Sequence, residues 1–393
     1  MFTLQSYNNL RNTEPLTTFT PAILSRNMIN KTTDTEKVVS LLTKLISTES
    51  ISRNEKVAAD IVFEWFVEQG YTPERICNNI VCKSHHWESN KPTVLLNSHI
   101  DTVKPVSAWS INPFEATIKD GKLYGLGSND AGASLVSLLH TFCQLDKTEQ
   151  SYNMLFVASA EEEVSGADGM KSIAPLFGNT LPEIALAIVG EPTDMQPAIA
   201  EKGLMVIDAE VKGVSGHAAR EEGINALYRA IDIIQIIKKL PLELKESPLL
   251  GAVKMSVTMI NSGTQHNVVP DLCTFTIDIR SNELYSNNDI FNLLEKKMPE
   301  WCTLKARSFV LNSSSLLGHN QSSPLVDKIT KKADEMGLKP FGSPTLSDQA
   351  ILSCPSFKMG PGSSARSHTA NEFIKIEEIS EALSTYYNLL NGI

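Results

Sequence analysis

Seven residues that could bind or activate divalent metal ions are spread along this 393-residue sequence. They are two histidines and five carboxylates: His99, Asp101, Asp130, Glu162, Glu163, Glu191 and His368. Imidazole nitrogen and carboxylate oxygen suit an ion that keeps a reactive water bound, and thiolates are optional in such a site. No single residue establishes a site, but the set predicts a hydrolase that binds two metal ions.

His99 and Asp101 follow an expected buried strand that contains the apolar run 94–96 and ends at Ser98. Open α/β sheets bind ligands at the carboxyl ends of their strands. Side chains two positions apart point to the same side, so Asp101 could accept the second N–H of His99 and fix its tautomer. A structural histidine with a hydrogen bond is an equally good interpretation of these two residues alone.

Asp130 follows a Gly-Leu-Gly segment, 125–127, at the start of an expected helix over 131–145. The two glycines suggest a nucleotide loop, but the third glycine is not in place and no acidic residue on a following strand supports dinucleotide binding. Two interpretations of Asp130 therefore stay open. It either caps the helix or extends both carboxylate oxygens to bridge two cations.

Carboxylates also follow the next two expected strands, 154–160 and 184–189. Most acidic runs are solvated surface, but the three glutamates at 161–163 come straight after a buried strand, which favours a cationic partner. Adjacent glutamates can divide the work, because one binds a metal while its neighbour takes a proton from water. Glu191, which precedes a proline, fits either a metal ligand or a turn residue.

A glycine-rich loop at 360–363 is followed by His368 near the C-terminus. The N–H groups of the loop could face an anion, although turn chemistry alone would account for its glycines. Turn chemistry would not account for His368, which therefore joins the candidate set.

The spacing of apolar residues predicts an α/β sheet covered by helices on both faces in the first half of the chain. Helices are expected at 36–46, 57–66 and 131–145, and strands at 94–96, 154–158 and 184–189. Further on, strands are expected at 204–211, 253–260 and 273–279, and helices at 225–239, 288–297, 324–336 and 376–390. This change indicates an α+β insert over 200–310. Residues 1–33 lack periodicity and are expected to form a flexible N-terminal arm.

Composition excludes several functions. The formal net charge is −10, and no stripe of Lys and Arg offers a surface for nucleic acid. The six cysteines are scattered without a C-x-x-C pair, which is typical of reduced thiols. No apolar run approaches the roughly 20 residues of a membrane span, and the first thirty residues lack a signal-peptide pattern. We expect a soluble cytoplasmic protein that binds neither membrane nor nucleic acid.

Eight segments, in this order, resemble the M20 family of co-catalytic zinc hydrolases, particularly the acetylornithine deacetylase and succinyl-diaminopimelate desuccinylase branch. They are S-H-I-D-T-V at 98–103, G-L-G-S-N-D at 125–130, E-E-E at 161–163, G-E-P-T at 190–193, G-V-S-G-H at 213–217, N-V-V-P at 267–270, D-I-R at 278–280 and H-T-A-N-E at 368–372. The resemblance extends over 36–393. It departs from the family at Gly132, where family members commonly carry lysine.

The resemblance implies a zinc-exopeptidase-like α/β domain, with a mixed sheet flanked by helices, formed by 34–199 and 311–393. The insert at 200–310 would be a lid and dimerisation domain. Two Zn²⁺ ions, with Co²⁺ or Mn²⁺ as substitutes, would be bridged by Asp130. By the same resemblance, one ion would also bind His99 and Glu191, and the other Glu163 and His368. Glu162 would act as the general base, and Asp101 would orient His99.

The resemblance also implies a homodimer in which His217 reaches the partner's site to stabilise the oxyanion. Asn267 and Arg280 would hold the substrate, and further N–H groups would come from the loop residues Gly360, Gly362 and Ser363. The expected substrate is an N-acyl-L-amino acid, first N-acetyl-L-ornithine of arginine biosynthesis. N-succinylornithine, N-succinyl-diaminopimelate and dipeptides are alternatives. Outside catalysis the alternative is a metal-binding dimeric scaffold, against which the intact Glu162 and His217 argue.

Overall fold

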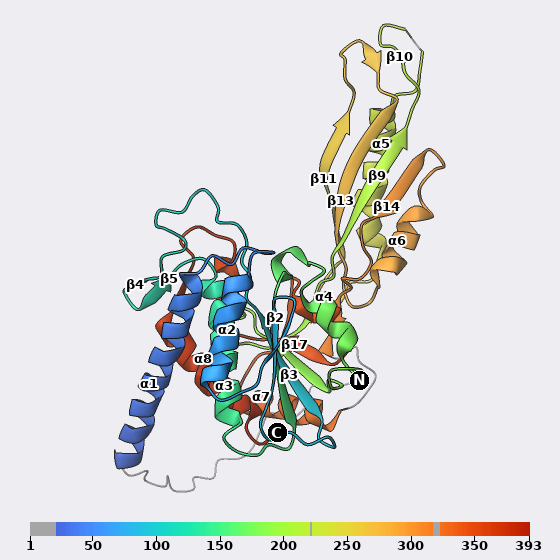
Figure 1. Cartoon of the computed structure of the whole chain (residues 1–393). Helices are drawn as coiled ribbons and strands as arrows, with labels where there is room; N and C mark the ends of the chain where they lie inside the picture. Colours follow the sequence, from blue (N-terminus) through green and yellow to red (C-terminus); the bar gives the residue numbers. More distant parts are fainter. Residues whose placement is uncertain (1–20, 221, 317–322) are drawn as a thin grey trace, which may run out of the picture.

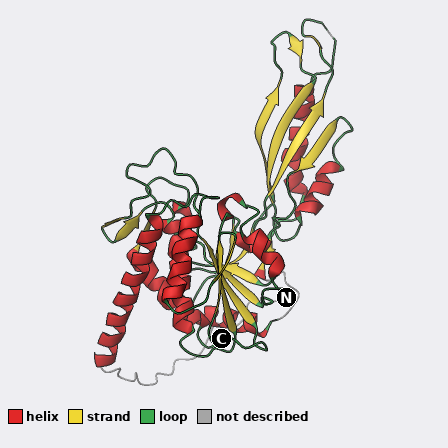
Figure 2. Ribbon diagram, viewed as in Figure 1, coloured by secondary structure: helices red, strands yellow, loops and turns green. Residues whose placement is uncertain are grey.

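The computed structural model describes residues 21–316 and 323–393, apart from residue 221. These residues form two bodies joined at a narrow waist (Figures 1 and 2). The larger one, here called the main domain, contains a nine-stranded sheet with helices around it. The smaller one, here called the insert domain, contains a separate four-stranded sheet.

The sheet of the main domain has the strand order β1-β2-β6-β3-β7-β17-β8-β15, and β16 also pairs with β8. Its strands are β1 (Glu74–Ile76), β2 (Asn79–Lys83), β3 (Thr93–His99), β6 (Asn153–Ser159), β7 (Leu186–Val189), β8 (Ala198–Glu201), β15 (Ser314–Ser315), β16 (Phe341–Ser343) and β17 (Ser356–Lys358). The four central strands, β6, β3, β7 and β17, run parallel to one another. Their carboxyl ends therefore meet at one edge of the sheet.

Helices cover both faces of this sheet. They are α1 (Pro21–Ile46), α2 (Lys56–Glu68), α3 (Ala133–Leu145), α4 (Met170–Ile173), α7 (Pro324–Glu335) and α8 (Ile376–Leu390). Alternation along β3 sends Val94 and Leu96 into the apolar core with α1, α2, α3, α7 and α8, whereas Leu95 packs with α4 on the other face. The predicted α/β class is confirmed, and every helix expected in this domain is present.

Helix α1 is longer than expected, because it begins at Pro21 and not near residue 36. The part of the expected arm that falls at 21–33 is therefore helical, while residues 1–20 lie outside the described residues. Proline fits the first helical turn, and no glycine or proline interrupts the chain between Pro21 and Ile46. Residues 21–33 thus extend a helix whose amphipathic part, 36–46, packs against the main domain.

The insert domain is an antiparallel sheet, β11-β13-β9-β14, with two helices on one face. Its elements are β9 (Met205–Lys212), β11 (Lys254–Ser262), β13 (Leu272–Arg280), β14 (Cys302–Ala306), α5 (Ala226–Lys239) and α6 (Asn287–Glu295). Inward residues of these strands and helices form their own apolar core. A short pair, β10 (Gly216–His217) and β12 (Val268–Val269), lies at the far tip (Figure 1).

The chain enters and leaves the insert domain through two segments that lie side by side, and the Leu204 N–H donates to the Leu311 carbonyl at 2.8 Å. A small sheet on the main domain joins β18 (Phe373–Lys375), β5 (Lys122–Tyr124) and β4 (Thr117–Lys119). Within the described part of the chain, we find no helix with both the length and the apolar character of a membrane span.

Candidate metal centre

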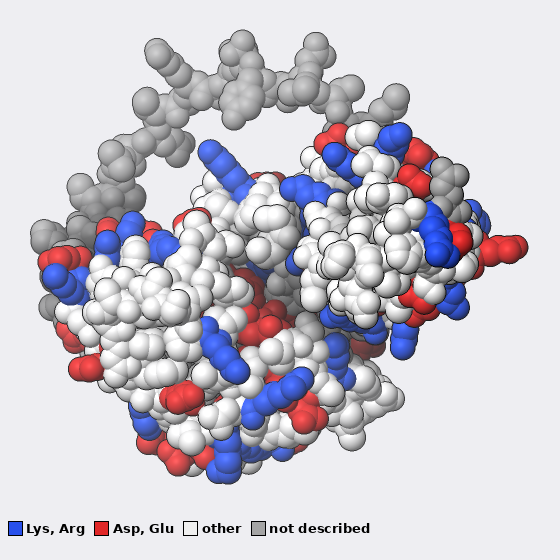
Figure 3. Space-filling view, turned by 90° about the horizontal axis from the view of Figure 1, so that it is seen from above, with Lys and Arg blue, Asp and Glu red and all other residues white. Residues whose placement is uncertain are grey.

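Three neighbouring strands deliver most of the candidate side chains to one edge of the sheet. Strand β3 ends at His99, the 3₁₀ turn that carries Glu162 and Glu163 follows β6, and Glu191 follows β7. Since β6, β3 and β7 are parallel neighbours, these residues lie at the same edge. The space-filling view shows acidic side chains on the floor of the hollow between the two domains (Figure 3).

Asp130 occupies the short segment between β5 and α3. Its backbone (φ −117°, ψ 99°) is not helical, so Asp130 precedes the helix and does not form part of it. Its Oδ1 lies 3.4 Å from the His99 Nε2, and its Oδ2 lies 3.6 Å from the His368 Nε2. One carboxylate thus presents one oxygen to each of two imidazoles.

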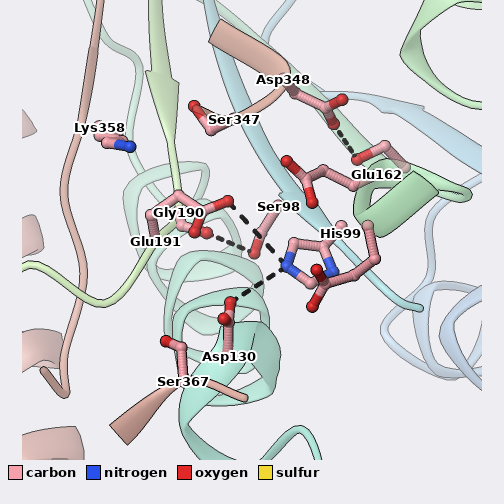
Figure 4. A network of polar contacts seen from close by, with 12 residues as sticks. Ser98, His99, Asp130, Glu162, Gly190, Glu191, Ser347, Asp348, Lys358 and Ser367 are labelled. Atoms are coloured by element: carbon pink, nitrogen blue, oxygen red, sulfur yellow. Dashed lines mark hydrogen bonds and ion pairs between the residues drawn. The ribbon is translucent and has the colours of Figure 1, made fainter. Parts of the chain in front are cut away.

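His368 reaches the cluster from a loop near the C-terminus, where it adopts a left-handed backbone (φ 59°). Its Nε2 lies 3.0 Å from Oε2 of Glu163. On the other side, the His99 Nε2 lies 4.0 Å from Oε1 of Glu191. Figure 4 shows His99 between Asp130 and Glu191.

These separations fit metal ligands. A tetrahedral zinc ion with bonds of about 2.1 Å places two of its ligand atoms roughly 3.4 Å apart. Two groups of three residues bring ligand atoms within 4.8 Å of one another, and they are His99 with Glu162 and Glu191, and His99 with Asp130 and Glu163. Imidazole and carboxylate are also the donors that zinc, cobalt and manganese accept. The residues present therefore fit two divalent ions, although the first group admits Glu162 as a ligand.

Asp101 has a different main contact from the one expected. The His99 Nδ1–H donates to the backbone carbonyl of Asp101 at 2.8 Å, whereas the carboxylate lies 3.5 Å away. Because a carbonyl only accepts, Nδ1 carries the proton and Nε2 faces the carboxylates. The Asp101 carboxylate instead accepts the N–H groups of Glu162 (3.1 Å) and Glu163 (3.2 Å). It fixes the turn that carries both glutamates.

The electrostatics of the cluster call for cations. Burial, with a contribution from Asp130, raises the pKa of Glu191 to about 8. Burial likewise raises the pKa of Glu162 well above its ordinary value. Burial opposes protonation of His99, but Asp101 and Asp130 outweigh it and hold the pKa of His99 well above its usual range. A nearby positive charge would stabilise the anionic form of carboxylates crowded in this way.

Sequence reasoning missed three buried polar features around this cluster. Glu372 accepts backbone N–H bonds from the segment that carries Asp130. Asp348 accepts from the Ser159 hydroxyl at 2.5 Å, and burial raises the pKa of Asp348 to about 6. Lys358 pairs with Glu201 at 3.2 Å. Only Glu372 lay inside a motif, and its partners are backbone atoms, which a sequence pattern does not identify.

The structure places two of the insert-domain candidates, His217 and Asn267, far from the metal residues of the same chain. His217 and Asn267 belong to the far tip, where the Ala218 N–H donates to the Asn267 carbonyl at 3.0 Å (Figure 1). Arg280 ends β13, and its Nε donates to Asp278 at 2.9 Å. A contribution of the tip to catalysis would therefore have to come from a second subunit or from a large domain movement.

The loop at 360–363 lies beside the site, but its N–H groups are partly engaged. The Gly360 N–H donates to the Thr193 hydroxyl at 3.1 Å, and the Ser363 N–H donates to the Asn129 side chain at 3.1 Å. Gly362 has φ +85°, and a Cβ there would lie 2.3 Å from Oδ1 of Asn129. In this conformation the loop connects the segments that carry Asn129 and Thr193. Anion binding through its N–H groups stays a prediction.

Comparisons with known proteins agree with the fold and with a metal-dependent hydrolase. The chain is 25% identical to a succinyl-diaminopimelate desuccinylase of Rickettsia bellii, over 89% of this chain and 95% of that protein. It is 27% identical to an acetylornithine deacetylase of Shigella sonnei, over 86% and 92%. A crystal structure of a dinuclear metal-binding peptidase from Bacillus subtilis has the same fold, with a TM-score of 0.66 at 13% identity over 92% of this chain and all of that one.

The model of Peptidase family M20/M25/M40 matches residues 95–392. The predicted resemblance is thereby confirmed, and with it the prediction of an enzyme that hydrolyses amide bonds with the help of metal ions. The chain belongs to Peptidase family M20/M25/M40.

Proposed function

We propose that this chain is a di-metal amidohydrolase that removes the acyl group from an N-acyl-L-amino acid, first N-acetyl-L-ornithine. The observation that carries this proposal is the position of Asp130, whose two oxygens face His99 and His368 at 3.4 and 3.6 Å. Glu162 lies beside this arrangement on a turn that Asp101 fixes. A carboxylate shared between two imidazoles and a neighbouring base is the donor set that amide hydrolysis with two metal ions needs.

Asp130 would hold both ions, with His99 and Glu191 on one side and Glu163 and His368 on the other. Zinc is our first choice, and Co²⁺ or Mn²⁺ would substitute. Two divalent ions bound there would polarise the scissile carbonyl and lower the pKa of a bound water. The His99 Nδ1–H donates to the Asp101 carbonyl and leaves Nε2 free to bind.

Glu162 would act as the general base. It would accept a proton from the attacking water and pass the proton to the leaving amine. This role needs a carboxylate within hydrogen-bond reach of the water and fixed by its surroundings. The N–H groups of Glu162 and Glu163 both donate to Asp101, which fixes the backbone that carries the two carboxylates.

Substrate recognition would come from the insert domain and from a homodimer that it forms. Arg280 would bind the substrate carboxylate through its planar guanidinium, and Asn267, from the tip of the partner subunit, would also hold the substrate. His217, exposed at the tip, would reach the site of the partner subunit and stabilise the oxyanion. In support, β11 is an edge strand of the insert sheet, and its Met259 and Ile260 are exposed.

The choice of substrate rests on the two relatives that are a deacetylase and a desuccinylase. They make N-acetyl-L-ornithine, in arginine biosynthesis, and N-succinyl amino acids the first compounds to test. A dipeptide is the third class, since peptidases share the fold. We expect the enzyme to be cytoplasmic, in keeping with such substrates.

The test measures release of primary amine from N-acetylornithine, N-succinylornithine, N-succinyl-diaminopimelate and a dipeptide. Each compound is given to the zinc-loaded enzyme and to the chelator-treated enzyme. We expect release from one N-acyl amino acid that stops on chelation and returns with Zn²⁺. Release from the dipeptide alone would reassign the substrate class, and release that survives complete metal removal would refute the proposal.

A further inference from the structure

Glu372 is a buried carboxylate on the same C-terminal segment as His368, and no metal role is proposed for it above. It is 2% exposed. Its carboxylate accepts three backbone N–H groups from the segment that carries Asp130: those of Gly127 at 3.2 Å, Asn129 at 2.8 Å and Asp130 at 2.9 Å. A single side chain thus satisfies three backbone donors in the turn before α3.

Other bonds join the same two segments. The Gly125 N–H donates to the Glu372 carbonyl at 3.1 Å. The Asn129 side chain donates to the Ser363 carbonyl and accepts from the Ser363 N–H, both at 3.1 Å. Phe373 pairs with Tyr124 where β18 meets β5. Two segments more than 230 residues apart in sequence are therefore locked together beside the metal residues.

The direction of the Asp130 side chain depends on these contacts between the two segments. Because the N–H groups of Asn129 and Asp130 both bind Oε1 of Glu372, the peptide plane that leads into Asp130 is fixed. The Asp130 oxygens then face His99 on one side and His368 on the other. His368 arrives on the segment that carries Glu372, so one piece of chain supplies both a candidate ligand and the support for the bridge.

A side chain with a single acceptor oxygen cannot make all three of these bonds in the same way. Both side-chain oxygens of Glu372 accept N–H bonds, Oε2 from Gly127 and Oε1 from Asn129 and Asp130, whereas glutamine has one oxygen and an NH₂ group that would face at least one of these N–H groups. A buried N–H group that loses its acceptor is costly. Glutamine at 372 would therefore disturb the turn that aims Asp130.

We propose that Glu372 is a positioning residue that holds Asp130 in the orientation required to bridge two metal ions. This inference rests on the proposed function. The partners that orient metal ligands typically contribute 10- to 100-fold to metal affinity. Glu372→Gln should lower the affinity for both ions by about that factor, because both share Asp130.

The test titrates the full-length, metal-free chain with Zn²⁺ in a calorimeter, without substrate. Wild type, Glu372→Gln and Glu372→Asp are compared, since aspartate keeps both acceptor oxygens but is one methylene shorter and should lose less affinity. Asp146→Asn is the matched control. Asp146 is also a buried carboxylate, it accepts from the His85 N–H and the Tyr71 hydroxyl at 2.9 Å each, and it lies at the opposite end of α3.

Weaker binding of both ions in Glu372→Gln, an intermediate effect in Glu372→Asp and unchanged affinity in Asp146→Asn would support the inference. Two ions bound by Glu372→Gln with wild-type affinity would overturn it, as would an equal loss in Asp146→Asn. If circular dichroism shows that Glu372→Gln does not fold, Glu372→Asp decides by the same criterion. A wild-type chain that binds no zinc would refute the proposed function itself, and the inference with it.

Discussion

Replacing Glu162 with glutamine should stop turnover while both metal ions stay bound. Glutamine has the same size, and the Glu162 N–H that donates to Asp101 is unaffected, so the turn should keep its shape. Only the capacity to accept a proton is lost. A general base contributes about 10²–10⁴-fold to the rate, which corresponds to about 2.7–5.4 kcal/mol in the activation free energy. We expect kcat to fall by that factor and KM to change little.

The two neighbouring glutamates are matched controls for this variant. Glu161 accepts from the Asp168 N–H at 3.4 Å and lines a surface pocket with Arg53, so Glu161→Gln should leave kcat within about twofold, as expected of a residue outside the chemistry. Glu163 lies 3.0 Å from His368, so Glu163→Gln should bind fewer ions. The same substitution at three successive glutamates should thus leave activity unchanged at 161, stop turnover at 162 and weaken metal binding at 163.

The assay measures kcat and KM by amine release, and the metal content of the same samples by atomic emission. If Glu162→Gln keeps kcat within tenfold of wild type, Glu162 is not the general base. Glu162→Gln that loses an ion would make Glu162 a ligand, in line with its place beside His99 and Glu191.

Three further predictions concern charge and assembly. Lys358→Met should lower the free energy of unfolding in urea by about 3–5 kcal/mol, because it leaves Glu201 buried without its cation. The double variant Lys358→Met with Glu201→Gln should lose less stability. An equal loss in the single and the double variant would contradict a stabilising Lys358–Glu201 pair. Glu163 raises the pKa of His368 to about 9, so the metal-free chain should keep this stabilisation below about pH 6.5 and lose it as the pH rises through 9. His368→Gln should flatten that pH dependence in denaturation curves, and an unchanged curve would refute the pairing. His217→Ala should lower kcat by about 10²–10³-fold without changing metal content, and an active wild-type monomer in sedimentation would exclude the proposed crossing between subunits.

Long periodic elements could be predicted from sequence, because their apolar faces repeat over several turns or residues. Helices α3, α5, α7 and α8 and strands β3, β9 and β13 lie within a few residues of the expected ranges. Strands of two or three residues, such as β5 and β18, carry too little pattern to be predicted. Their positions depend on tertiary contacts, and β18 is found only where the C-terminal segment meets β5.

The candidate ligands could also be predicted, because His99, Glu163 and Glu191 each follow a buried strand and strand ends are placed by the sheet. The supporting contacts could not. Asp101 acts through its backbone carbonyl and through the N–H groups of the glutamate turn. Glu372 likewise binds backbone atoms, which are the same for every residue type. Only the folded chain shows which backbone groups such side chains meet.

The domain arrangement was beyond sequence reasoning for a similar reason. Periodicity identified the elements of the insert, but no local pattern reports the distance between His217 and His99. The structure places His217 on β10 at the far tip (Figure 1). The roles assigned to that tip are therefore proposals about a second subunit, whereas the contacts around Asp130 are observed within one chain.

The most direct test of the account is a zinc titration of the chelator-treated enzyme with N-acetylornithine, in which bound metal and released amine are measured at each addition. We predict that two Zn²⁺ ions bind per chain, that full activity requires both, and that Asp130→Asn binds at most one ion and releases no amine. Full activity in the metal-free enzyme, or wild-type zinc stoichiometry and turnover in Asp130→Asn, would contradict the central claim that Asp130 bridges two catalytic metal ions.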